Sequence, residues 1–151
     1  MKQLFLGLCA VTLLAASPAR ASYAFSALGT VQAVGNNASD KLRIRVNATM
    51  PTLIEFDVKD NGSADFSIDA AAFTGIVVDA GGGNDVVVID PSASAVLSTK
   101  TLTIDGGAGK DTITTLAGTQ TILAGEGDDV VNAGPGNDTV LLGSSRRTAG
   151  A

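Results

Sequence analysis

Short apolar runs alternate with polar positions along this chain, and Gly, Asn, Asp or Ser breaks each run after a few residues. In the run 101–104, Leu102 and Ile104 would face one side of a strand while the threonines face the other. Helical periodicity is nearly absent beyond the N-terminal segment. The pattern predicts an all-β chain, with strands near residues 42–47, 52–58, 64–69, 75–79, 86–90, 101–105, 112–115, 121–123, 130–132 and 139–142.

The first of these strands contain a hairpin signal. Asp60-Asn61-Gly62 lies between the predicted strands 52–58 and 64–69, and Asn-Gly is typical of tight hairpin turns. The two strands either form a small antiparallel cap or are already coils of a β-helix that lack a metal-binding signature. The sequence leaves both arrangements open.

A pentapeptide of the form Gly-x-Gly-x-Asp occurs four times in the second half of the chain, each time followed by Val or Thr and then by Val or Ile. A tight glycine turn, one carboxylate and one buried strand residue together make up one repeat of a parallel β-roll. The two glycines and the aspartate of each copy are Gly81, Gly83, Asp85; Gly107, Gly109, Asp111; Gly125, Gly127, Asp129; and Gly134, Gly136, Asp138. The inward strand residues, which we expect in the core, are Val87, Ile113, Ile122, Val131 and Val140.

The spacing of the copies predicts how the turns stack. Asp111 and Asp129 are 18 residues apart, and Asp129 and Asp138 are 9 apart. Nine residues make one turn plus one strand of a β-roll, so turns 18 apart stack on one edge and turns 9 apart lie on opposite edges. We therefore expect the turns ending at Asp85, Asp111 and Asp129 to form one column. The turn ending at Asp138 would lie on the other edge, beside a degenerate turn that ends at Gln120.

The interval between the first and second copies is longer than the others. Asp85 and Asp111 are 26 residues apart, which exceeds one coil by eight residues. We assign the extra residues to a loop at 91–100 on the far edge, because Pro91 and several small residues suit an excursion from the coil.

Stacked turns of this composition suit Ca²⁺, which takes six to eight oxygen ligands from carboxylates and carbonyls. Coils stack about 4.8 Å apart, so an ion between two turns can take ligands from both. The column offers two such intervals, one from Asp85 to Asp111 and one from Asp111 to Asp129, whereas Asp138 has only a half-site.

The same turns are costly without the cation. Stacked carboxylates repel each other by about 1 kcal/mol or more, and glycine-rich turns lose the most entropy on ordering. We therefore expect the metal-free repeats to be disordered or molten, so that calcium binding is coupled to folding.

The chain begins with the pattern of a secretory signal. Lys2 precedes an apolar run at 4–16, and Ala19-Arg20-Ala21 fits the small-x-small cleavage rule. Residues 1–21 are therefore a predicted signal peptide, and the protein is expected outside the cytoplasm, in the medium, at the cell surface or in the periplasm. The apolar run is too short to span a bilayer, so we expect no membrane insertion.

Charge and composition argue against several other kinds of site. Removal of residues 1–21 leaves eight basic residues against fifteen acidic ones, a net charge of −7, which attracts cations and repels nucleic acid. It also removes the only cysteine, so a metal ion is the obvious replacement for disulfides. The chain has no His, which excludes imidazole zinc sites and Ser-His-Asp triads. Asp60 and Asp65 are better explained by a solvated hairpin than by a catalytic carboxylate pair, and we predict no enzyme.

The four copies resemble the consensus Gly-Gly-x-Gly-x-Asp-x-hydrophobic-x of the haemolysin-type, or RTX, calcium-binding repeat family, over roughly residues 75–142. The resemblance implies a short right-handed parallel β-roll, or β-helix, with Ca²⁺ as its cofactor. It also implies that the four aspartates are calcium ligands, and that the paired glycines of each copy supply backbone carbonyls to the same ions.

The chain departs from the family pattern in three respects. Only the second copy has Gly at the first consensus position, Gly106, whereas Ala80, Ala124 and Ala133 stand there in the other copies. The array is short, and the predicted export signal is N-terminal, where many family members use a C-terminal one. The toxin or enzyme domains that often accompany such arrays have no counterpart in this sequence, so their activities are not transferred to it.

These observations divide the chain into a signal peptide (1–21), an N-terminal β segment or cap (22–74), a Gly-Asp-rich repeat β-roll (75–142) and a disordered tail (143–151). The expected function is calcium binding coupled to folding outside the cytoplasm. The alternative is an extracellular β-solenoid with a structural or adhesive role, in which calcium is merely structural or absent. That alternative predicts similar folding with and without calcium.

Overall fold

The computed structural model describes residues 24–143, with side chains described from residue 29 onward. The predicted signal peptide and all but the first residue of the predicted tail lie outside the described residues. Within residues 24–143 the chain is all-β apart from three short helical segments, which confirms the predicted class. These segments are η1 (Ala70–Ala72), η2 (Pro91–Ala93) and α1 (Ser94–Leu97), and none of the described helices is long and apolar enough to cross a membrane.

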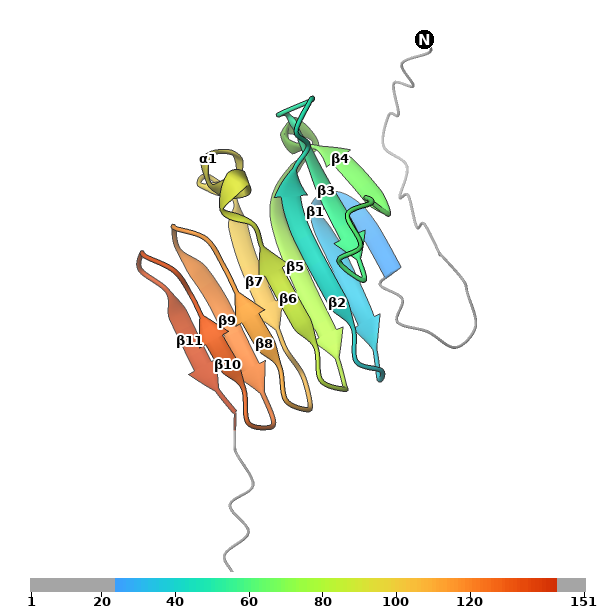
Figure 1. Cartoon of the computed structure of the whole chain (residues 1–151). Helices are drawn as coiled ribbons and strands as arrows, with labels where there is room; N and C mark the ends of the chain where they lie inside the picture. The colour runs from blue at the N-terminus through green and yellow to red at the C-terminus, as the bar shows by residue number, and fades with distance from the viewer. Residues whose placement is uncertain (1–23, 144–151) are drawn as a thin grey trace, which may run out of the picture.

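The strands form two sheets (Figure 1). Every pair in the first sheet is parallel, and its strands, in spatial order, are β1 (Ala24–Asn36), β5 (Phe73–Gly81), β7 (Thr101–Asp105), β9 (Gln120–Gly125) and β11 (Thr139–Leu142). In the second sheet β10, β8, β6 and β2 are parallel, whereas β3 and β4 are antiparallel additions. The bounds in this sheet are β10 (Val130–Asn132), β8 (Thr112–Thr114), β6 (Val86–Ile89), β2 (Lys41–Val46), β3 (Leu53–Val58) and β4 (Phe66–Asp69).

From β5 onward, consecutive strands alternate between the two sheets. The turn after β5, β7 or β9 lies at one edge, and the connection after β6, β8 or β10 lies at the other, where α1 stands out in Figure 1. The long connection from β6 to β7 contains η2 and α1, which confirms the predicted excursion at residues 91–100. Its start is capped by Asp90, whose Oδ1 accepts a 2.9 Å hydrogen bond from Ser92 N.

The two sheets enclose one apolar core because alternate residues of each short strand point inward. Register keeps like positions above one another: Ile104 pairs with Ile122 in one sheet, and Val87 with Ile113 in the other. These four side chains are buried, which confirms the core prediction for Val87, Ile113 and Ile122. Val131 packs partly buried against the core.

The prediction that Val140 belongs to the core was wrong. Val140 is 37% exposed, because β11 is the last strand of its sheet among the described residues and no further coil covers it. Leu141 and Leu142 on the same strand are also exposed.

The N-terminal region combines the two arrangements that the sequence left open. β1 and β2 form a coil, since β1 pairs in parallel with β5 and β2 pairs in parallel with β6. The predicted hairpin follows: β3 and β4 are antiparallel, and the turn between them has positive φ at Lys59, Asp60 and Gly62.

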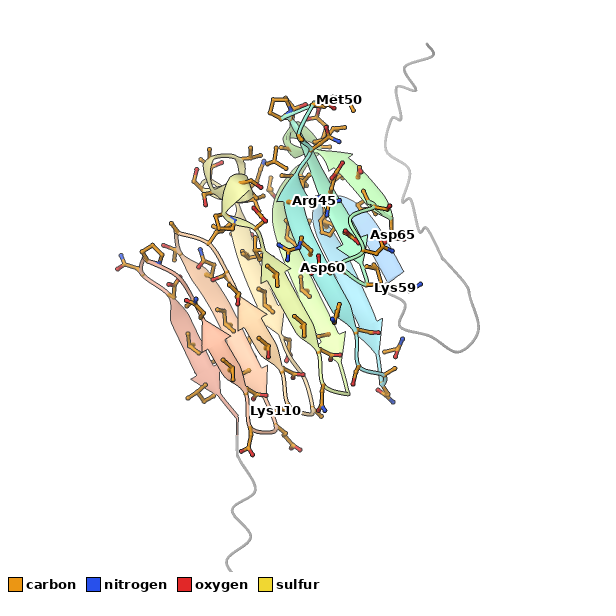
Figure 2. The ribbon with its side chains drawn as sticks, in the orientation of Figure 1. Arg45, Met50, Lys59, Asp60, Asp65 and Lys110 are labelled. Atoms are coloured by element: carbon orange, nitrogen blue, oxygen red, sulfur yellow. The ribbon has the colours of Figure 1, made fainter. Side chains whose placement is uncertain are left out.

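Charged side chains tie β2 to the hairpin, with Arg45 of β2 (labelled in Figure 2) as the cation. Arg45 donates to Asp57 at 2.8 Å and to Glu55 at 2.9 Å, and Asp57 also accepts from the backbone N–H of Asn61 and Gly62. The Arg45 hydrogen bond helps to hold the pKa of Asp57 below its usual value although burial opposes the shift. Asp57 is therefore a buried carboxylate that a protein cation neutralises.

Candidate metal centre

Three of the four glycine turns stack directly on one another. Parallel bridges join Gly82 to Ala108 and Ala108 to Glu126, so the turns 81–85, 107–111 and 125–129 lie in register at one edge of the molecule. We call this set of turns the Asp column. Its existence confirms the stacking predicted from the spacing of Asp85, Asp111 and Asp129.

The motif glycines are required by this close stacking. Gly107 and Gly109 have φ of 89° and 139°, values that residues with a side chain rarely adopt. An ideal Cβ on Gly109 would lie 1.5 Å from Gly83 O, and one on Gly107 would lie 1.7 Å from Gly81 O. The third turn of the column repeats both features at Gly125 and Gly127, with φ of 98° and 144° and the carbonyl oxygens of the preceding turn 1.9 and 1.5 Å from the ideal Cβ positions.

Backbone carbonyls of the motif run along the stack. Gly81 O accepts a 2.9 Å hydrogen bond from Ala108 N, and Gly107 O accepts a 2.7 Å bond from Glu126 N. Each of these oxygens retains a second lone pair. The stacked turns thus bring carbonyl and carboxylate oxygens to the same edge of the sheets.

The aspartates form a ladder along the column. Asp111 Oδ1 accepts a 2.8 Å hydrogen bond from Asp85 N, and Asp129 Oδ1 accepts a 2.9 Å bond from Asp111 N. Each carboxylate therefore reaches back to the preceding turn and satisfies one backbone N–H there. The second oxygen of each carboxylate is left for another partner.

The ladder extends to a turn that sequence analysis missed. Asp85 Oδ1 accepts a 2.7 Å hydrogen bond from Asp40 N, and Asn36 pairs with Gly81, so the turn Asn36–Asp40 stacks below the first motif turn. This turn contains no Gly-x-Gly, which is why motif searching missed it. The sequence Asp40-Lys41-Leu42 does repeat the Asp-x-hydrophobic part of the motif, and Leu42 is buried, so a signal was present.

Several carboxylate oxygens in these turns are buried without a partner. Among the described residues, Asp40 Oδ1, Asp40 Oδ2, Asp85 Oδ2 and Asp111 Oδ2 make no hydrogen bond, and we call these four atoms the orphan oxygens. The three side chains are each about 1% exposed. A buried acceptor without a donor costs about 1–3 kcal/mol, and more if it is charged. The orphan oxygens therefore mark places where a cation would be strongly favoured.

The raised pKa values of Asp85 and Asp111 also show that these carboxylates lack a neighbouring positive charge. Burial raises the pKa of Asp85 to about 6, and the negative charges of Asp111 and Asp40 add to the rise, against the hydrogen bond from Asp40 N. Burial also raises the pKa of Asp111, helped by the charges of Asp129 and Asp105 and opposed by the Asp85 N–H.

The pKa of Asp40 is raised by burial as well. The backbone N–H of Asn36 opposes part of that rise without making a hydrogen bond of normal geometry. In the described part of the chain, no Lys or Arg forms an ion pair with any of these three acids.

Side chains alone do not complete a metal site. Within residues 24–143, no three Asp, Glu, His or Cys side chains gather closely enough to hold an ion. This follows from the repeat, which supplies one column aspartate per turn and leaves the remaining ligands to backbone oxygens. Hard oxygen donors of mixed carboxylate and carbonyl type fit Ca²⁺ better than any transition metal.

The opposite edge holds the fourth copy apart from the other three. Gly118 bridges to Gly136, and an ideal Cβ on Gly136 would lie 1.7 Å from Gly118 O. Gly134 and Gly136 have φ of 74° and 148°. The turn ending at Asp138 therefore stacks on the degenerate turn, as predicted.

At this edge the carboxylate of Asp138 accepts hydrogen bonds from Gln120. Gln120 N donates to Asp138 Oδ1 at 3.0 Å. With the Gln120 amide oriented to satisfy its hydrogen-bond network, its nitrogen donates to the same oxygen at 2.8 Å and to Ala133 O at 3.0 Å. Asp138 is half-buried and lacks an orphan oxygen, unlike Asp85 and Asp111.

Comparison with protein families gives one match. Residues 103–119 and 114–146 match the family model described as RTX calcium-binding nonapeptide repeat (4 copies). We call residues 103–146, which match this family model, the RTX segment. Repeats of this family bind Ca²⁺. The RTX segment includes the turns ending at Asp111, Asp129 and Asp138, whereas the turn ending at Asp85 precedes it. No curated protein and no solved structure matches the chain.

Proposed function

We propose that this protein binds Ca²⁺ between successive turns of the Asp column and that binding is coupled to folding. The observation that carries the proposal is the pair of orphan oxygens Asp85 Oδ2 and Asp111 Oδ2, which are buried in stacked turns where no Lys or Arg of the described residues pairs with either aspartate. A divalent ion there would neutralise the carboxylates and take further ligands from the backbone carbonyls of both turns.

The proposed ligand set follows the predicted motif residues. Asp85, Asp111 and Asp129 would supply carboxylate oxygens, and the glycines paired with them would supply carbonyl oxygens. Asp138 would form only a half-site, because Gln120 already donates to it from both its backbone and its amide. Alternation of parallel strands between two sheets supports a short β-roll, for which we propose the right-handed form common to parallel crossovers.

Coupling of binding to folding follows from charge and entropy. Buried carboxylates in one column repel each other, and positive-φ glycines are costly to order. A ligand that binds only the folded state stabilises it by about 2.7 kcal/mol at a concentration one hundred times its Kd.

Export and the absence of catalysis are parts of the same proposal. Millimolar extracellular calcium suits a site whose carboxylates are few, since such modules bind at roughly 10⁻⁴ to 10⁻³ M. The predicted signal peptide 1–21 would deliver the chain there. We also propose that the chain divides into an N-terminal segment at residues 22–74 and the repeats at residues 75–142. Calcium binding by the repeats needs no catalytic group.

Calorimetric titration of the calcium-depleted chain with Ca²⁺ tests the ligand assignment. Asp111 belongs to two intervals of the column, so Asp111→Asn should weaken binding by roughly tenfold to a hundredfold, corresponding to the loss of a charged contact of about 1.5–3 kcal/mol. Asp138→Asn removes the same charge from the opposite edge and should change binding much less.

Equal losses for the two variants would contradict the column assignment. Absence of calcium binding by the unaltered chain would reject the calcium function itself. If the chain also had the same fold with and without calcium, the extracellular β-solenoid scaffold would become the better explanation.

A further inference from the structure

We propose that the turn Asn36–Asp40 and the turn 81–85 form a third calcium site, with Asp40 and Asp85 as its charged ligands. This site rests on the proposed function, because it applies the same interval chemistry to a further pair of stacked turns. It lies outside the RTX segment, and one of its two turns lacks the Gly-x-Gly-x-Asp motif.

The turn Asn36–Asp40 contacts the next turn as the motif turns contact each other. Gly82 N donates to Asn36 O at 2.8 Å, as Ala108 N donates to Gly81 O one coil later. Asn84 N donates to Ser39 Oγ at 2.9 Å, as Lys110 N donates to Asn84 Oδ1. The turn is therefore a structural member of the column although its glycines are replaced.

Three of the four orphan oxygens belong to the aspartates that end these two turns. Asp40 contributes both of its carboxylate oxygens and Asp85 contributes Oδ2, while both side chains are about 1% exposed. The hydrogen bond from Asp40 N to Asp85 Oδ1 holds the two residues next to each other. Among the described residues, no two successive motif aspartates have as many unsatisfied carboxylate oxygens as this pair.

The same pair of turns also carries a neutral side-chain oxygen. An ideal Cβ on Gly82 would lie 3.4 Å from Asn37 Oδ1, which places that amide oxygen beside the second turn. Amide, carboxylate and carbonyl oxygens are the ligands that Ca²⁺ prefers, and its tolerant geometry does not require the motif glycines.

Asp57 is another buried carboxylate and provides a comparison with Asp40. Its side chain is fully buried, yet Arg45 and two backbone N–H groups satisfy it. Asp40 is about as buried, but among the described residues no Lys or Arg pairs with it and neither of its carboxylate oxygens has a hydrogen-bond partner of normal geometry. The missing positive charge at Asp40 is the role that we assign to calcium.

The test is calorimetric titration of the calcium-depleted full chain with CaCl₂ at about pH 7.5, for the unaltered protein, Asp40→Asn and Asp40→Glu. Asp40→Asn preserves the shape of the side chain and removes its charge, so the stoichiometry should fall by about one Ca²⁺ per chain. Asp40→Glu keeps a carboxylate and should retain more binding than Asp40→Asn. The exposed Asp79→Asn removes one charge from β5 and serves as the control, with unchanged stoichiometry expected.

The order of the variants separates a ligand from a packing residue. If Asp40 only fills space, the isosteric Asp40→Asn will bind calcium as the unaltered chain does and the larger Asp40→Glu will be the more damaged variant. That result would overturn the third site and leave the proposed function intact, provided that Asp111→Asn still loses binding. Loss of all calcium binding in the unaltered chain would reject both proposals.

Discussion

A column aspartate in this protein has two separate roles. One oxygen accepts from the backbone N–H of the preceding turn, which fixes the side chain, and at Asp85 and Asp111 the other oxygen is buried without a donor. The motif glycines permit this arrangement, since a Cβ at Gly107 or Gly109 would overlap the carbonyl of the turn below. Gly and Asp are thus linked: the glycines bring the turns together, and the carboxylates then need a cation.

Substitution of a motif glycine should cost more than substitution of an ordinary turn glycine. Gly109→Ala places a Cβ 1.5 Å from Gly83 O and also requires a positive φ, so we expect a loss of about 3 kcal/mol or more in unfolding free energy. Gly62→Ala has the same φ problem at 89° with nothing within 4 Å, and should lose about 1–2 kcal/mol. Urea unfolding in saturating calcium measures both, and equal losses would show that the stacking contact is unimportant.

At the level of elements, the hairpin β3–β4 contrasts with the turns of the column. The neighbouring strand β2 supplies the hairpin with a cation, because Arg45 pairs with Glu55 and Asp57 and also donates to Gly62 O at 3.0 Å. Phe56 and Phe66 join its two strands with ring centroids 5.4 Å apart. The unit of β2, β3 and β4 should therefore need no calcium to neutralise its buried carboxylate.

Loss of the hairpin cation should lower stability without changing calcium stoichiometry. Arg45→Met leaves Asp57 buried without its cation and should cost about 3 kcal/mol, as for other broken buried pairs. Arg43→Met removes a more exposed pair with Asp60 and Asp90 and should cost about 1 kcal/mol or less. Urea unfolding and calcium titration of both variants provide the check. A fall in stoichiometry for Arg45→Met would mean that the hairpin contributes to a calcium site.

Across the whole molecule, the sequence predicted the repeats better than the start of the column. Spacings of 18 and 9 residues placed Asp111 and Asp129 on one edge and Asp138 on the other, and the 26-residue interval placed Asp85 with the first two once the excursion at residues 91–100 was allowed for. β1 was missed although Val31 and Ala33 alternate with polar neighbours and are buried. Asp40 was missed because its turn lacks glycine, and the Arg45–Asp57 pair depends on the pairing of β2 with β3, which no local pattern specifies.

The charge of the column predicts an unusual dependence on pH. Burial raises the pKa values of Asp40, Asp85 and Asp111, the second to about 6, so the folded state binds more protons than the unfolded state between about pH 4 and 6. The stabilising protonation is present below the unfolded value of 3.8 and is lost as pH rises through the folded values. In calcium-depleted buffer, far-UV circular dichroism should therefore show a gain of β signal on acidification from about pH 7 to pH 5.

The acids with lowered pKa values affect stability in a different pH range. Asp57, Asp60 and Asp90 contribute stability above their unfolded value of 3.8 and lose it only at lower pH. They should therefore not obscure the gain between pH 7 and 5. A steady loss of β signal across that window would contradict buried, unneutralised carboxylates in the column.

The most direct test of the calcium proposal is far-UV circular dichroism of the calcium-depleted full chain during titration with Ca²⁺, with Mg²⁺ as the control ion. We expect β signal to increase at roughly 10⁻⁴ to 10⁻³ M calcium, with little response to Mg²⁺, which requires near-ideal octahedral geometry. The rise should be accompanied by a higher thermal midpoint. A β spectrum and a midpoint that are the same with and without calcium would contradict calcium-coupled folding of the repeats.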